Sequence, residues 1–165
     1  MWPPFLTFIL CTDTSDFIRR RRKVFSQQEW QQRVEEIVKD RTRYAPYYLL
    51  LGMRVKELLP GRSLLELDAG PCHLDERGQV HPGVVFSLAD AAAGVAAVTL
   101  FPEGSRRVVT VEMKLNYLDE IGAGPLVALG EAEGKRERVI LSKVEIFDGG
   151  GSKVAFGSAT LMFTA

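Results

Sequence analysis

Residues 82 to 101 form a run of twenty mostly small or apolar residues that contains a single charged side chain, Asp90. Pro82 suits the first turn of a helix, because the N–H group that proline lacks would have no partner there. A helix that is apolar on nearly every side has to be enclosed by other structure. The run is long enough to span a membrane, but a carboxylate near its centre and the strand-like segments around it favour a helix buried in a globular protein.

The chain beyond Pro102 has an apolar residue at every second position over long stretches. From Val109 to Tyr117 the odd-numbered positions are apolar and the even-numbered ones are polar, which places Thr110 on the polar face of a strand. The pattern predicts four strands, at residues 108–117, 126–133, 139–147 and 153–163, with turns at 122–125, 134–136 and 148–151. Strands joined by such short turns pair antiparallel, because parallel strands need longer crossovers.

The residues before the apolar run predict a further helix and a hairpin. Ser26 and Glu29 have the spacing of a capping box, and apolar residues recur with a helical period over residues 27–43. Pro46 stops this helix, and residues 47–51 are interpreted as a short apolar connector. Two strands, at residues 53–59 and 63–69, are joined by the turn signal Pro60-Gly61. These elements make an α+β domain in which an antiparallel sheet wraps one buried helix.

The charges of the 165-residue chain balance, because Lys and Arg total 21 and Asp and Glu also total 21. No overall field steers such a chain onto nucleic acid or an anionic membrane, which favours a neutral or small-molecule partner. Five basic and two acidic residues give residues 1–23 a net charge of +3, against −3 for the rest. We interpret residues 1–23 as a poorly ordered basic leader and residues 24–165 as a single domain, and we expect removal of the leader to leave activity intact.

Two cysteines, Cys11 and Cys72, are too few for a disulfide framework, so the composition favours a reducing, cytoplasmic setting. No spacing of His, Cys, Asp and Glu suggests a metal site, and no glycine-rich segment leads from a strand into a helix as a nucleotide-binding loop would. The sequence therefore predicts no metal, no cofactor and no stable insertion into a membrane.

Asp90 is the residue whose position most needs an explanation. A carboxylate within an apolar helix is costly to bury unless it has a partner or its pKa rises. It either points to solvent or makes a structural hydrogen bond, or else it serves as a general base or nucleophile. The residues alone do not decide between the structural and the catalytic role.

The segment from His73 to Gly94, HLDERGQVHPGVVFSLADAAAG, resembles the signature of hotdog-fold acyl-CoA thioesterases of the phenylacetate-pathway (PaaI) type. That signature reads Asn-x-x-Gly-x-x-His-Gly-Gly and continues into a central helix that contains Leu-Ala-Asp. The resemblance extends through residues 110–117 and 124–126 into the last strands and covers residues 45–165. It implies the hotdog fold, a long helix wrapped by an antiparallel sheet, and hydrolysis of the thioester bond of an acyl- or aryl-CoA.

The same resemblance implies roles for three residues. Asp90 matches the acid that activates water or attacks the thioester carbonyl. Thr110 falls where the family often has a hydroxyl that helps to hold this water. His81 matches a histidine that lies beside the thioester and usually orients its neighbours rather than acting as a base.

Two residues depart from the family where the oxyanion should be stabilised. Asp75 replaces an asparagine, and a carboxylate accepts hydrogen bonds without donating any. Pro82 replaces a glycine and has no N–H. Loss of one oxyanion donor costs on the order of a hundredfold or more in rate, and the backbone N–H of Gly83 or Val84, at the N-terminus of the helix, is the expected replacement.

A CoA substrate needs cations for its phosphates. The candidates near predicted turns, any one of which could equally be a solvated surface residue, are Arg106, Arg107, Lys135, Arg136 and Arg138. In this family the site usually forms between two subunits. The resemblance therefore implies a homodimer, or a homotetramer built from two dimers, in which Asp90 of one chain meets the His81 loop of the other.

Two other functions stay open at this point. One is a hotdog hydratase or dehydratase, because Pro82-Gly83-Val84 resembles the helix start of the dehydratases and Asp75 with His81 resembles the Asp and His of the hydratases. The dehydratase acid would fall at Leu88, however, and the hydratase spacing differs by one residue. The other function is a catalytically weak acyl-CoA-binding protein that has lost its oxyanion donors.

Overall fold

The computed structural model describes residues 26–43, 45–100 and 107–164. Helices α3 (Gln27–Arg43) and α4 (Pro46–Leu51) precede strands β1 (Arg54–Leu59) and β2 (Arg62–Ala69). A short 3-10 turn, Pro71–His73, leads to helix α5 (Pro82–Val98). Four strands follow, β3 (Arg107–Tyr117), β4 (Gly124–Arg136), β5 (Val139–Asp148) and β6 (Lys153–Thr164). The proposed leader, residues 1–23, lies outside the described residues.

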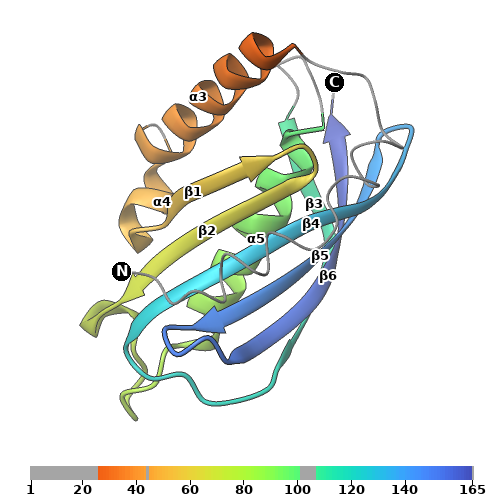
Figure 1. Cartoon of the computed structure of the whole chain (residues 1–165). Coiled ribbons are helices and arrows are strands. Elements are labelled where there is room, and N and C mark those ends of the chain that lie inside the picture. The colour runs from red at the N-terminus through yellow and green to blue at the C-terminus, as the bar shows by residue number, and fades with distance from the viewer. Residues whose placement is uncertain (1–25, 44, 101–106, 165) are drawn as a thin grey trace.

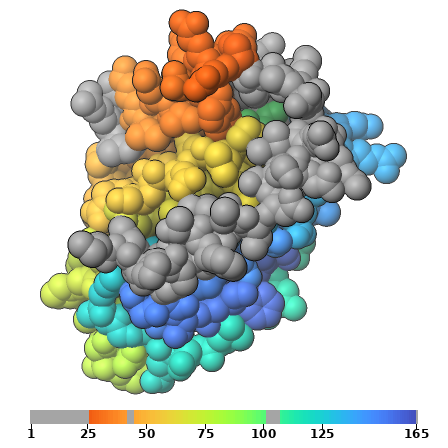
Figure 2. Space-filling model, viewed as in Figure 1, coloured from red at the N-terminus to blue at the C-terminus, as the bar shows by residue number. Residues whose placement is uncertain are grey.

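Helix α3 begins as predicted at a capping box. The Ser26 N–H donates to Oε2 of Glu29 over 2.7 Å, and the Glu29 N–H donates to Oγ of Ser26 over 3.2 Å. The buried Arg33 donates from Nη2 to the Val98 carbonyl oxygen over 3.2 Å and so ties α3 to the last turn of α5. Figure 2 shows α3 at one end of the molecule, next to the β1–β2 hairpin.

The predicted connector after α3 is a helix. Pro46 does not break structure there, because proline is accepted at the first position of a helix. The helix ends at Leu51 and is capped by Gly52, whose φ of 65° lies in the left-handed region and whose N–H donates to the Leu49 carbonyl oxygen. Tyr47 and Tyr48 therefore project from a short helix rather than from a loop.

The six strands form one antiparallel sheet in the order β1-β2-β4-β5-β6-β3. The predicted β1–β2 hairpin is confirmed, and β3 lies at the far edge beside β6 (Figure 1). The predicted turn at residues 134–136 is wrong, because β4 continues to Arg136. A bulge between Ala132 and Gly134 lets the strand continue through the glycine. The turn lies at Glu137, whose φ is 52°.

Helix α5 lies across the concave face of this sheet (Figure 1). It ends at Val98, three residues before the end of the apolar run. At Gly130 of β4 the helix comes so close that an added Cβ atom would lie 2.4 Å from the Ala92 carbonyl oxygen. Ser63 of β2 donates to the same oxygen over 2.7 Å. The predicted α+β architecture, an antiparallel sheet around one buried helix, is confirmed.

Candidate active site

Asp90 lies on the face of α5 that the sheet leaves uncovered. Four residues at helical spacing share this face: Gly83, Ser87, Asp90 and Gly94. Each of them is exposed or half-buried, whereas the neighbouring Ala89 is buried. A Cβ atom added to Gly94 would have no other atom within 4 Å. The Asp90 carboxylate is therefore outside the apolar core, and the surface beside it is open.

Thr110 of β3 donates a hydrogen bond from its hydroxyl to Oδ1 of Asp90 over 2.6 Å. Thr110 thus lies on the helix-facing side of the strand, the side on which Met113 and Leu115 pack against the core. The predicted polar face is wrong, because β3 has a bulge between Thr110 and Glu112. A bulge adds one residue to a strand and shifts the alternation of its side chains. The hydroxyl occupies one carboxylate oxygen and leaves Oδ2 for another donor.

Two tyrosines form hydrogen bonds with the N-terminal part of α5. Tyr47 of α4 lies 2.7 Å from the Ser87 hydroxyl, which itself donates to the Gly83 carbonyl oxygen over 2.7 Å, so Tyr47 is the donor to Ser87. Tyr117 of β3 donates to the Pro82 carbonyl oxygen over 3.0 Å. Helix α4 and strand β3 therefore both form hydrogen bonds with the N-terminal part of α5, the helix that carries Asp90.

The sequence does not indicate Tyr48 of α4 as a site residue, because residues 47–51 lack a pattern that predicts a helix beside Asp90. Burial raises the pKa of Tyr48 to about 12; the nearby Arg41 guanidinium opposes this rise, and the Asp90 carboxylate adds to it. The Arg41 guanidinium stacks over the Tyr48 ring at 5.7 Å from its centroid. Asp90 is thus close enough for its charge to act on this tyrosine, which forms part of the surroundings of the carboxylate.

His81 caps the N-terminus of α5. Its Nδ1 accepts a hydrogen bond from the Gly83 N–H over 3.0 Å, so Nε2 is the protonated nitrogen of the neutral ring. Pro82 contributes no N–H to this turn. The Gly83 N–H, one of the expected replacement oxyanion donors, is therefore already bound to His81.

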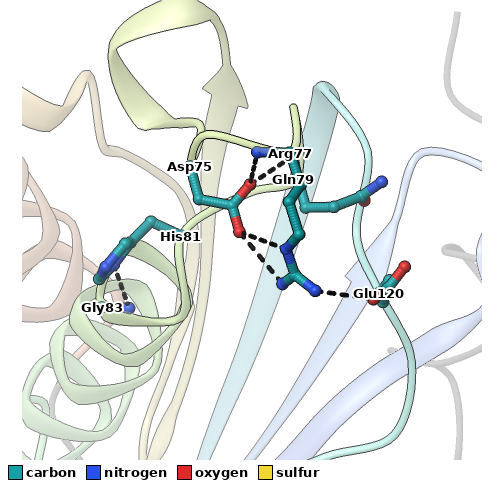
Figure 3. A network of polar contacts seen from close by, with 6 residues as sticks. All are labelled: Asp75, Arg77, Gln79, His81, Gly83 and Glu120. Atoms are coloured by element: carbon teal, nitrogen blue, oxygen red, sulfur yellow. Dashed lines mark hydrogen bonds and ion pairs between the residues drawn. The ribbon is translucent and has the colours of Figure 1, made fainter.

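Asp75 closes the loop that precedes α5 (Figure 3). Its Oδ1 accepts from the N–H groups of Arg77 and Gln79 over 2.9 and 3.0 Å, and its Oδ2 lies 3.2 Å from Nη2 of Arg77. Arg77 in turn reaches Glu120 at 3.4 Å. The bond from the Gln79 N–H, with those from Arg77 and its positive charge, lowers the pKa of Asp75. The carboxylate points to Arg77 and not to His81, so the structure does not bring together the pair that a hydratase would need.

Four of the five predicted phosphate-binding cations lie at one end of the sheet: Arg107, Lys135, Arg136 and Arg138. They gather there because β3 and the start of β5 both pair with the last residues of β6. All four side chains are exposed. The fifth, Arg106, lies outside the described residues.

Within residues 26–43, 45–100 and 107–164, no group of His, Cys, Asp and Glu side chains is arranged to hold a metal ion. No helix in this part of the chain is long and apolar enough to cross a membrane. Helix α5 covers Pro82–Val98 of the predicted run and packs against the sheet.

The chain is similar to thioesterases in sequence and in structure. Residues 77–155 match the model of the thioesterase superfamily. A thioesterase family protein from Silicibacter pomeroyi is 28% identical, with a TM-score of 0.71 over 81% of this chain and 97% of that one. A mutant of the phenylacetic acid degradation protein PaaI from Thermus thermophilus is also 28% identical, with a TM-score of 0.64 over 71% of this chain and 97% of that one.

The PaaI protein of the phenylacetic acid degradation operon of E. coli has the same fold, with a TM-score of 0.73 at 17% identity over 84% of this chain and 95% of that one. The antiparallel sheet around α5 is the architecture that the hotdog resemblance implied. Sequence and fold together make the chain similar to hotdog-fold thioesterases of the PaaI type, and the match to the thioesterase superfamily supports a thioester hydrolase.

Proposed function

We propose that the protein hydrolyses the thioester bond of an acyl- or aryl-CoA, with Asp90 as the group that promotes attack on the carbonyl. The observation that carries this proposal is the hydrogen bond from Thr110 to Asp90 on the open face of α5. Because Thr110 donates to Oδ1, the carboxylate is held in one orientation and Oδ2 stays available to accept a proton from water. The family match supplies the reaction class, and this pair supplies the reacting group.

In the proposed reaction the oxygen of a water molecule attacks the thioester carbonyl carbon while Asp90 takes the proton. The tetrahedral oxyanion then collapses, the carbon–sulfur bond breaks, and the thiolate of CoA leaves with the proton from Asp90. If Asp90 attacks the carbonyl itself, the carbon–sulfur bond breaks and the CoA thiolate leaves as a mixed anhydride forms, and water then hydrolyses the anhydride to the same acid and the free Asp90 carboxylate. A single turnover in oxygen-18 water that labels the Asp90 carboxylate would demonstrate the covalent route, because only attack of water on the Asp90 carbonyl carbon of the anhydride places the label there.

The separation of Asp90 and His81 supports a site between two subunits. The two residues are nine positions apart on one helix, and a rise of about 1.5 Å per residue separates them by about 13 Å along the axis. A single thioester carbonyl therefore cannot touch both residues of one chain. We propose that Asp90 of one protomer faces His81 of its partner in a homodimer, and that two dimers can pair into a tetramer.

Strand β3 is the edge at which such a partner would bind. It is the last strand of the sheet, and Val109 and Val111 are 40% and 59% exposed. An edge strand presents unpaired N–H and C=O groups to any strand of a second chain. The exposed cations at the end of the sheet near Arg107 would then bind the CoA phosphates. Such local cations are needed because the chain has no net charge that would attract an anionic ligand.

The test is release of free thiol from acetyl-, palmitoyl- and benzoyl-CoA by the wild type, by Asp90→Asn, and by Asp40→Asn, which removes an exposed carboxylate of α3 as a matched control. We expect hydrolysis of at least one ester, its near-complete loss in Asp90→Asn, and no change in Asp40→Asn. Equal, minimal turnover by the wild type and Asp90→Asn with retained CoA-ester binding would support the binding protein instead. Loss of the conjugated absorbance of an enoyl-CoA would support the hydratase.

A further inference from the structure

The start of α5 offers no N–H group that is free to bind an oxyanion. Pro82 has none, the Gly83 N–H donates to Nδ1 of His81, and the Val84 N–H donates to the His81 carbonyl oxygen over 2.9 Å. Asp75 has no proton to donate as a carboxylate, and its two oxygens are bound by the loop. Every donor expected from the sequence is therefore absent or engaged.

One donor remains at this position, and it belongs to the side chain of His81. Because Nδ1 accepts from Gly83, the neutral ring carries its proton on Nε2. His81 is exposed, and no hydrogen bond to its Nε2 is present among the described residues. The ring thus presents an N–H whose direction is fixed by a backbone hydrogen bond at the other nitrogen.

His73 shows what a purely structural histidine looks like in the same protein. It is buried, its Nδ1 accepts from the Gly70 N–H over 3.0 Å, and its Nε2 lies 3.2 Å from the Leu51 carbonyl oxygen. Both histidines therefore carry the proton on Nε2. His73 donates this proton in a hydrogen bond to the main chain, whereas His81 has no such bond among the described residues. The difference singles out His81 as the histidine with a donor to offer.

We propose that the Nε2–H of His81 is the oxyanion donor of this enzyme and replaces the asparagine and glycine donors that Asp75 and Pro82 have removed. This inference rests on the proposed function. As the carbonyl carbon becomes tetrahedral, negative charge gathers on its oxygen, and the imidazole N–H stabilises this charge without transferring its proton. His81 would act on the thioester that Asp90 of the partner subunit attacks.

Gly83 serves this arrangement as the residue that sets the ring. Its N–H orients Nδ1, and a Cβ atom at this position would lie 3.0 Å from Nδ1 and 3.3 Å from Cε1 of His81. A side chain at this position would therefore require the imidazole to shift by a few tenths of an ångström. Gly83 is in this view a positioning residue rather than the donor that its place at the helix N-terminus suggested.

Two substitutions separate the donor from the helix cap. Asparagine is a good N-cap but its amide does not reach the position of Nε2, whereas the amide of glutamine reaches that position but caps poorly. We expect His81→Asn to keep the wild-type Tm and KM and to lose about a hundredfold in kcat, the cost of one oxyanion donor. We expect His81→Gln to have a lower Tm but a higher kcat than His81→Asn. A His81→Asn enzyme with the kcat of the wild type would overturn the proposal.

Pro82 allows a rescue experiment. Pro82→Gly restores the backbone N–H that the family uses, so it should raise the kcat of His81→Asn by about tenfold or more. Failure of this rescue in a folded double variant would contradict the proposal. Asp90→Asn tests the proposed function separately: if it abolishes hydrolysis and His81→Asn does not, the function stands and the role of His81 falls.

Discussion

The Thr110 hydroxyl lies 2.6 Å from Oδ1 of Asp90 and joins the edge strand β3 to the open face of α5. The bond sets the orientation of the only acidic side chain on the helix. The bond also joins two residues, Asp90 and Thr110, that are twenty positions apart in the chain.

Removing the Thr110 hydroxyl should slow the reaction. Thr110→Val keeps the shape of the side chain but not the donor, and a hydrogen bond to a charged group contributes about 1.5–3 kcal/mol, so kcat should fall by about ten- to a hundredfold. Thr110→Ser keeps the hydroxyl and is expected to stay near the wild type. Steady-state kinetics on the best CoA ester check this. Equal kcat values for the Val and Ser variants would show that the bond does not contribute.

Two inactive variants should restore activity when mixed if the site spans two subunits. In a dimer that pairs Asp90→Asn with His81→Asn, one of the two sites keeps both wild-type residues. With random exchange, half of the dimers are mixed, so about a quarter of the wild-type activity is expected. The measurement is thiol release after the subunits are unfolded and refolded together, with mass spectrometry to count mixed dimers. Mixed dimers without activity would place the site within one chain.

Gly130→Ala should strongly destabilise the fold. The added Cβ atom would lie 2.4 Å from the Ala92 carbonyl oxygen, so α5 would have to move off the sheet, and such overpacking costs about 1–3 kcal/mol or more. Gly94→Ala is the matched control on the open face of α5, where the helix gains up to about 1 kcal/mol. Urea unfolding of both variants checks the pair. If Gly130→Ala unfolds at the wild-type midpoint, the close contact of α5 with β4 is incorrect.

Asp75→Asn should lower stability near neutral pH but not in acid. The loop lowers the pKa of Asp75, so its contribution is complete above the unfolded value of about 3.9 and is lost as pH falls through the folded value. The Tm difference between wild type and variant is therefore expected to be largest near pH 7 and to vanish in strong acid. Thermal unfolding between these limits checks it, with Asp40→Asn as control. A difference independent of pH would mean that the charge of Asp75 does not matter.

Much of the fold was predictable, because it depends on local patterns. The capping box of Ser26 and Glu29 marks the start of α3, and Pro82 marks the start of α5. The alternation of apolar residues located β3, β5 and β6 to within about one residue at each end, since a half-buried strand needs that period whatever its partners are. Asp90 can be recognised from the sequence because it is the single charged residue in an apolar run.

The sequence by itself therefore determined most of the elements, the central helix and the acidic residue on it, but not helix α4 or the end of β4. Only the tertiary structure decided which residues meet Asp90. Thr110 turns toward the helix because of a bulge, and bulges depend on the pairing of β3 with β6, which a run of strand-forming residues does not reveal.

The same holds for the donors at the start of α5. Sequence shows that Gly83 has an N–H and that His81 has two nitrogens, but not that one is bound to the other. A hydrogen bond consumes a donor only when the folded chain sets both groups at the right distance and angle. That single contact leaves Nε2 of His81 as the free donor, and it is a property of the three-dimensional arrangement alone.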